Sequence, residues 1–184
     1  MSRLDELLEF NEKFVEGQEY EAFKTSKFPD KKMVILTCMD TRLTELLPKA
    51  LNLKNGDAKI IKNAGAIVSH PFGSIMRSLI VAVYDLGAEE VFVIGHHGCG
   101  MGSINAENTL QKMRDRGISE DTIQTLGHAG IDLNKWLARI DSIPESVRTS
   151  VEMIHQHPLI PNDVPIHGLV IDPETGKLDH VISI

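Results

Sequence analysis

Several features are scarce in this sequence, and each scarcity excludes a class of protein. Only two of the 184 residues are cysteine, too few for a disulfide framework, and no apolar run approaches the ~20 residues that span a bilayer. Lysine and arginine number 19 against 26 aspartates and glutamates, with no dense basic stripe for nucleic acid. The opening MSRLDELLEF is too acidic and too polar for a signal peptide. We therefore expect a cytoplasmic protein that binds neither nucleic acid nor a membrane.

What remains is the composition of an ordinary globular protein. Hydrophobic residues make up 42% of the chain and charged residues 24%, with a net charge of −7. A chain of this length can bury a core without covalent staples. No repeat, low-complexity segment or flexible linker divides it. We expect one domain over residues 1–184, in which residues 1–27 form an N-terminal helical arm.

Apolar runs alternate with helical patterns along the chain. In the first half we expect strands at 33–38, 58–65 and 91–96 and helices at 4–16 and 74–86. In the second half we expect helices at 105–117, at 119–127 and from Ser142 to Pro158, then strands at 166–172 and 177–184 joined by a turn. This alternation predicts an α/β fold: a mostly parallel central sheet flanked by helices, with a C-terminal strand pair.

The stretch GHHGCG, residues 95–100, places imidazoles and a thiol where a predicted buried strand ends. Cys38 ends another predicted strand, and ligands of open parallel sheets bind beyond the carboxyl ends of the strands. Cys38, His96 and Cys99 form the type of set that prefers zinc, and three protein ligands leave a fourth position open for catalysis. Taken singly, each is explained better by a buried small residue or a plain turn. Their occurrence together at matching strand ends favours the metal.

The segment GCGMGS also imitates a glycine-rich phosphate loop in front of a helix. It lacks the GK[ST] ending of a P-loop, and its glycines do not have the GxGxxG spacing. A glycine-rich turn of this kind is a weak signal, so nucleotide binding is kept as a minor alternative.

The stretch CMDTRL adds a carboxylate and a guanidinium directly after the first candidate ligand. Asp40 and Arg42, two residues apart on a loop, can pair in a bidentate manner. One interpretation is a salt bridge that only fixes the loop. Beside a metal, the carboxylate could instead move between Arg42 and the ion and act as a gate.

Three blocks of the sequence, CMDTR, KNAGA and HHGCG, resemble the signature blocks of the β-class carbonic anhydrases. That family usually reads C-x-D-S/T/A-R, R-N-A-G and H-x-x-C-G, in this order. The resemblance covers most of the chain and is strongest for a short bacterial subgroup. It implies that Cys38, His96 and Cys99 bind Zn²⁺ and that Asp40 and Arg42 are a catalytic dyad. In a closed state Asp40 itself would ligate the zinc.

The resemblance also implies an activity and an assembly. The activity would be reversible hydration of CO₂ to bicarbonate and a proton, by attack of a zinc-bound hydroxide, in a homodimer or homotetramer. Phe72 and Gly65 would lie in the substrate pocket. The alternatives are hydrolysis of carbonyl sulfide or carbon disulfide at the same zinc site, or a non-catalytic protein that binds zinc and bicarbonate.

Two positions depart from the family pattern or add to it. Lys62 stands where many members have arginine, which we expect to affect structural pairing more than chemistry. His97 is an additional imidazole directly beside a predicted ligand. We interpret it as a solvent-facing residue in preference to a proton shuttle.

Overall fold

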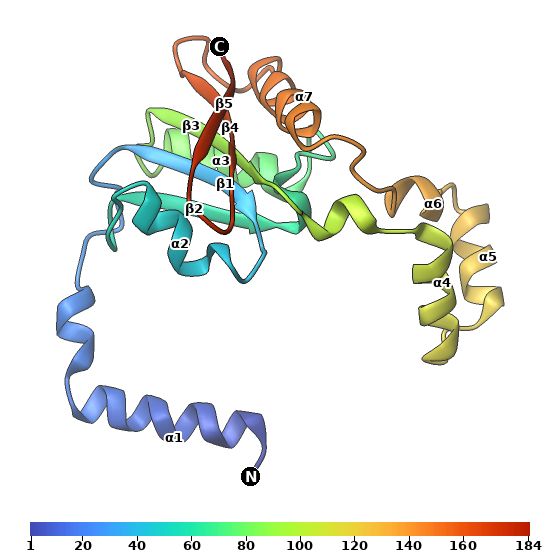
Figure 1. The fold of residues 1–184 in the computed structure, drawn as a ribbon, viewed down its shortest axis with the longest axis horizontal. Helices are drawn as coiled ribbons and strands as arrows, with labels where there is room; N and C mark the ends of the chain where they lie inside the picture. The colour runs from blue at the N-terminus through green and yellow to red at the C-terminus, as the bar shows by residue number, and fades with distance from the viewer.

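The computed structural model describes every residue from 1 to 184 and shows a five-stranded sheet with helices on both faces (Figure 1). The strands are β1 (Met33–Cys38), β2 (Ala58–Asn63), β3 (Glu90–His96), β4 (Ile166–Ile171) and β5 (Leu178–Ser183). Their order is β2-β1-β3-β4-β5, and all neighbours are parallel except β4 and β5, which are antiparallel. The predicted fold class is therefore confirmed.

Three helices pack against this sheet and make two hydrophobic cores. They are α2 (Leu43–Ala50), α3 (Ser74–Tyr84) and α7 (Ile143–His155). Leu79 of α3 and Val151 of α7 belong to the core on one face, and Leu43 and Leu47 of α2 belong to the core on the other. The central strands are thus buried on both faces, which explains why their sequences are uninterrupted apolar runs.

The alternation of side chains along β1 connects these two cores. Val34 and Leu36 belong to the core under α3 and α7, while Ile35 belongs to the core under α2. On β3 and β4 the helix α7 comes so close that a methyl group on Gly95 or Gly168 would lie 2.8 Å from a side-chain carbon of Val147. Both glycines therefore permit the close packing of helix on sheet.

The remaining helices extend away from the sheet (Figure 1). They are α1 (Arg3–Glu16) and the short 3₁₀ helix η1 (Glu19–Phe23) at the N-terminus, and α4 (Ala106–Asp115), α5 (Glu120–His128) and α6 (Leu133–Trp136) between β3 and α7. A capping box between Ser2 and Asp5 begins α1, none of whose residues is buried. None of the helices combines the length and apolarity that crossing a membrane requires.

The structure departs from the sequence prediction at a few element boundaries. The strand expected at 58–65 ends at Asn63, and Ala64–Ala66 form the 3₁₀ turn η2 because Gly65 has a φ of 85°. The helix expected to reach residue 86 ends at Tyr84. The sequence analysis predicts no helix at 43–50, and the structure forms α2 there with Pro48 inside it, although proline normally ends a helix.

Candidate metal centre

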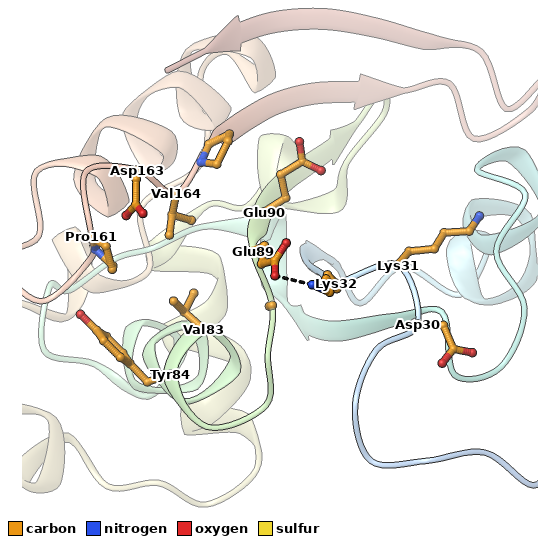
Figure 2. Close-up of a pocket in the computed structure, with 12 residues that line it drawn as sticks. Asp30, Lys31, Lys32, Val83, Tyr84, Glu89, Glu90, Pro161, Asp163 and Val164 are labelled. Atoms are coloured by element: carbon orange, nitrogen blue, oxygen red, sulfur yellow. Dashed lines mark hydrogen bonds and ion pairs between the residues drawn. The ribbon is translucent and has the colours of Figure 1, made fainter.

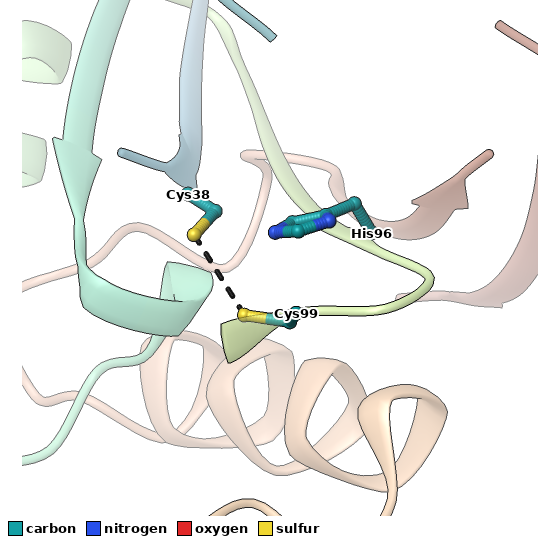
Figure 3. A group of neighbouring side chains, drawn as sticks. All are labelled: Cys38, His96 and Cys99. Carbon is teal, nitrogen blue, oxygen red and sulfur yellow. Dashed lines mark hydrogen bonds between the residues drawn. The ribbon is translucent and has the colours of Figure 1, made fainter. Parts of the chain in front are cut away.

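Three candidate ligands meet at the carboxyl ends of two neighbouring strands. Cys38 ends β1, His96 ends β3, and Cys99 lies three residues further on, in the loop before the 3₁₀ helix η3 (Gly100–Ser103). Because β1 and β3 pair in parallel, their carboxyl ends lie side by side. One nitrogen and two sulfur atoms of these buried residues lie within 4.8 Å of one another (Figure 3). The group could hold a metal ion.

The imidazole of His96 is fixed by a backbone carbonyl. Its Nδ1 lies 2.9 Å from the carbonyl oxygen of His97, and because a carbonyl can only accept, Nδ1 is the nitrogen that donates. Its Nε2 is buried and has no hydrogen-bond partner. Leaving such an atom unsatisfied costs about 1–3 kcal/mol. A metal ion bound at Nε2 would remove this penalty, and a carbonyl on the other ring nitrogen is a usual partner of a ligating histidine.

The two thiols lie at the distance that a shared metal requires. Cys38 Sγ and Cys99 Sγ are 3.8 Å apart, and the backbone N–H of Gly65 donates to Cys38 Sγ at 3.4 Å. Two sulfur ligands, each about 2.3 Å from a tetrahedral zinc ion, are separated by about 3.8 Å. The observed spacing therefore fits zinc without movement of either side chain.

The protonation of Cys99 depends on its surroundings. Burial raises the pKa of the Cys99 thiol, and the neighbouring Cys38 thiol raises that pKa further. A bound cation has the opposite effect and deprotonates a coordinating thiol outright. Binding of a metal would therefore release protons from this centre.

Asp40 and Arg42 form a bidentate ion pair at the edge of the centre. Arg42 Nε donates to Asp40 Oδ1 at 3.0 Å, Arg42 Nη2 donates to Oδ2 at 2.8 Å, and the Arg42 backbone N–H also donates to Oδ1. Arg42 Nη2 further donates to the carbonyl of Gly98, in the loop between His96 and Cys99. These hydrogen bonds from Arg42 hold the pKa of the Asp40 carboxyl far below its usual range. Asp40 Oδ2 is 3.7 Å from His96 Nε2, so the carboxylate faces the candidate ligands.

A cavity of about 440 Å³ opens beside the centre. Cys38, Cys99, Asp40 and Arg42 contribute its polar groups, and Met39, Ala64, Met101 and Ile104 contribute apolar surface. A larger hollow of about 770 Å³ lies at the amino ends of the strands, lined by lysines, carboxylates and prolines (Figure 2). The candidate ligands are absent from its lining, so the smaller cavity is the one that a substrate of the metal centre would use.

Of the other residues singled out from the sequence, one lies beside the candidate ligands and two lie on the exposed surface. Gly65 is buried and donates its backbone N–H to Cys38 Sγ, but it does not line the cavity in which it was predicted to lie. Phe72 is 70% exposed, does not line the cavity, and packs its ring against His157 at 5.0 Å. His97 is exposed and its Nε2 lies 3.5 Å from Asp179, as expected for a residue that faces solvent.

The glycine-rich loop does not have the form of a phosphate site. It leads into η3, a 3₁₀ turn of four residues, and the next α-helix begins only at Ala106. A phosphate site of the P-loop type needs the N-terminus of an α-helix directly after the loop. The minor alternative of nucleotide binding therefore loses its structural support.

Backbone groups of the centre were missed by the sequence analysis. The carbonyls of His97 and Gly98 orient His96 and Arg42 respectively. Every residue carries a carbonyl, so the sequence contains no signal for either role. The positive φ of 62° at Gly98 shows why a glycine stands at this point of the loop.

The sequence of this chain is similar to those of known carbonic anhydrases and related enzymes. The profile of the family described as carbonic anhydrase matches residues 33–178. The chain is 60% identical over 183 residues to "Putative carbonic anhydrase YtiB" of Bacillus subtilis (strain 168), covering 100% of this chain and 98% of the relative. It is 31% identical over 159 residues to a "Carbon disulfide hydrolase" of Acidithiobacillus thiooxidans, covering 81% and 76%.

A solved structure agrees over nearly the whole length. The crystal structure of β-carbonic anhydrase isoform I from Trichomonas vaginalis superposes with a TM-score of 0.90 at 36% identity and covers 99% of this chain and 98% of that one. The family profile, the extent of the identities and the superposition lead to one conclusion: the chain belongs to the β-class carbonic anhydrase family.

Proposed function

We propose that this protein is a zinc-dependent carbonic anhydrase that hydrates CO₂ reversibly to bicarbonate and a proton. The observation that carries the proposal is the centre itself. Two thiols and one imidazole nitrogen converge within 4.8 Å, and the ion pair of Asp40 and Arg42 stands beside them. Cys38, His96 and Cys99 would hold the zinc and leave a fourth position open. Bound zinc supplies Lewis-acid activation of water near neutral pH.

The dyad would orient the reacting water. Asp40 is ionised at neutral pH because Arg42 stabilises its charge, so its carboxylate can only accept hydrogen bonds. A water molecule between Asp40 and the open position would donate one hydrogen to the carboxylate and direct its lone pair toward the cavity. Arg42 would keep Asp40 from entering the open position itself. The apolar surface of Met39, Met101 and Ile104 suits CO₂, which carries no charge.

Carbon disulfide hydrolysis is the second candidate function. Relatives named carbon disulfide hydrolase share about a third of their residues with this chain, for example 31% over 161 residues in Acidianus. CO₂ and CS₂ are both linear and apolar, so the same cavity could admit either. The 60% identity over 183 residues to two relatives that are each named "Putative carbonic anhydrase" supports CO₂ as the first choice.

We further propose that residues 1–27 serve as an arm for self-association into a homodimer or homotetramer, within a single domain of 184 residues. Helix α1 extends from the sheet with no buried residue and presents Leu4, Leu7, Leu8 and Val15, each more than half exposed (Figure 1). These residues recur at the spacing of one helix face. An apolar face left in water by one chain is well matched to a second copy.

The zinc centre predicts the metal content of the purified protein. We expect about one zinc per chain, the number that one three-ligand site takes, and a large loss of zinc in Cys99→Ser, as measured by elemental mass spectrometry. His97→Ala is the matched control, because its side chain faces Asp179 while the carbonyl that orients His96 belongs to the backbone. Full zinc retention in both Cys38→Ala and Cys99→Ala would contradict the assignment.

The dyad predicts the effect of Arg42→Ala on CO₂ hydration, followed by stopped flow at pH 7. Removing the guanidinium frees Asp40 to occupy the open position, so we expect a loss of about 10²–10³-fold with the zinc content unchanged. Arg139→Ala is the control, because Arg139 pairs with Asp141 at 2.7 Å with the same two-residue spacing, outside the cavity. Hydration near the wild-type rate in Arg42→Ala would show that the pair only fixes a loop.

The two candidate substrates can be compared on one preparation. Both reactions would use the same centre, so one zinc-loaded preparation serves for both. We expect a higher kcat/KM for hydration of CO₂ than for release of sulfide from CS₂, in line with the higher identity to the relatives named for carbonic anhydrase. Faster turnover of CS₂ would reverse the order of the two functions. Turnover of neither substrate by fully zinc-loaded protein would point to the non-catalytic alternative.

The arm predicts a change in association state. Leu7→Glu places a charge in the apolar face of α1 and should shift the sedimentation coefficient toward that of a monomer. Glu9→Gln, on the polar face of the same helix, should leave sedimentation unchanged. A wild-type chain that sediments as a monomer at micromolar concentration would refute the arm's role.

A further inference from the structure

Two histidines outside the zinc centre converge on one serine at the β4–β5 edge of the sheet. His167 Nδ1 and His180 Nε2 each lie 2.8 Å from the hydroxyl oxygen of Ser183. His180 and Ser183 are exposed, and His167 is partly exposed. Neither the zinc centre nor its cavity includes these residues.

A carboxylate sets the tautomer of His167. Its Nε2 lies 3.3 Å from Glu90 Oε1, and because a carboxylate accepts, Nε2 donates and Nδ1 keeps a free lone pair. The ring also packs against Phe92, with centroids 4.9 Å apart. A histidine whose one nitrogen is bonded to a carboxylate while the other points at a shared position is the usual arrangement of a metal ligand.

A β-bulge places the second histidine on the same side as the first. Residues three apart on a regular strand, such as His180 and Ser183, point to opposite faces. In the pairing of β4 with β5, Gly168 is opposite Ile182 and Leu169 is opposite His180, so Val181 has no partner. The extra residue returns His180 to the face of Ser183, and bulges commonly redirect a side chain in this way at functional positions.

We propose that His167 and His180 form a second, exchangeable metal site for a divalent transition metal ion, at the position where the Ser183 hydroxyl now bridges them. Imidazole nitrogens suit Zn²⁺, Ni²⁺ and Cu²⁺, and solvent would complete the coordination at this exposed site. Glu90 would orient His167 from behind without touching the ion. The bound ion would tie β5, the last strand, to β4.

Ni²⁺ is the probe, added to protein whose zinc centre is already loaded. Equilibrium dialysis with elemental mass spectrometry counts both metals at once, and we expect one Ni²⁺ per chain with zinc unchanged. His180→Ala should lose the Ni²⁺. Glu90→Gln should weaken its binding by about 10–100-fold, the usual effect of removing an orienting partner. Ser183→Ala keeps both imidazoles and should still bind.

His128→Ala is the matched control, because His128 is an exposed histidine on α5, a helix that extends away from the sheet (Figure 1). It should bind Ni²⁺ as the wild type does. Wild-type protein that takes up no Ni²⁺, or His180→Ala that takes up as much as wild type, would overturn the proposal. Because zinc is counted separately, either result leaves the proposed carbonic anhydrase centre to be judged on its own.

Discussion

The parallel pairing of β1 with β3 is the constraint on which the candidate centre depends. It brings the ends of two buried strands together. Thr37 and Ile94 pair across 57 positions of sequence, and this pairing places the neighbouring Cys38 and His96 close to each other. The two cores on either side of the sheet fix these strands. Burial of the candidate ligands then follows, and burial makes the unpaired Nε2 of His96 costly without a metal.

The ion pair of Asp40 and Arg42 determines how the carboxylate is placed on the side of the centre that faces the cavity. Arg42 donates to both oxygens of Asp40 and also to the carbonyl of Gly98, in the loop that carries the candidate ligands His96 and Cys99. One guanidinium therefore sets the charge and the position of the carboxylate. The exposed pair of Arg139 and Asp141 has the same two-residue spacing but lines no part of this cavity.

Much of this arrangement could be predicted from the sequence because it rests on side-chain type and strand order. The apolar runs that end in Cys38 and His96 predict the sheet edge where both ligands lie. Features that rest on backbone geometry could not be predicted. The carbonyls of His97 and Gly98 have no signal in the sequence, and the bulge at Val181 depends on how β4 and β5 pair. Phe72 was expected in the pocket but lies on a loop beside His157, a placement set by tertiary packing.

X-ray absorption spectroscopy at the zinc edge of the purified protein tests the central claim most directly, because it counts the donor atoms around the metal. The account predicts two sulfur ligands at about 2.3 Å, one imidazole nitrogen at about 2.0–2.1 Å, and one further oxygen donor. A first shell with a second imidazole, with no sulfur, or with four protein ligands drawn only from cysteine and histidine would contradict it.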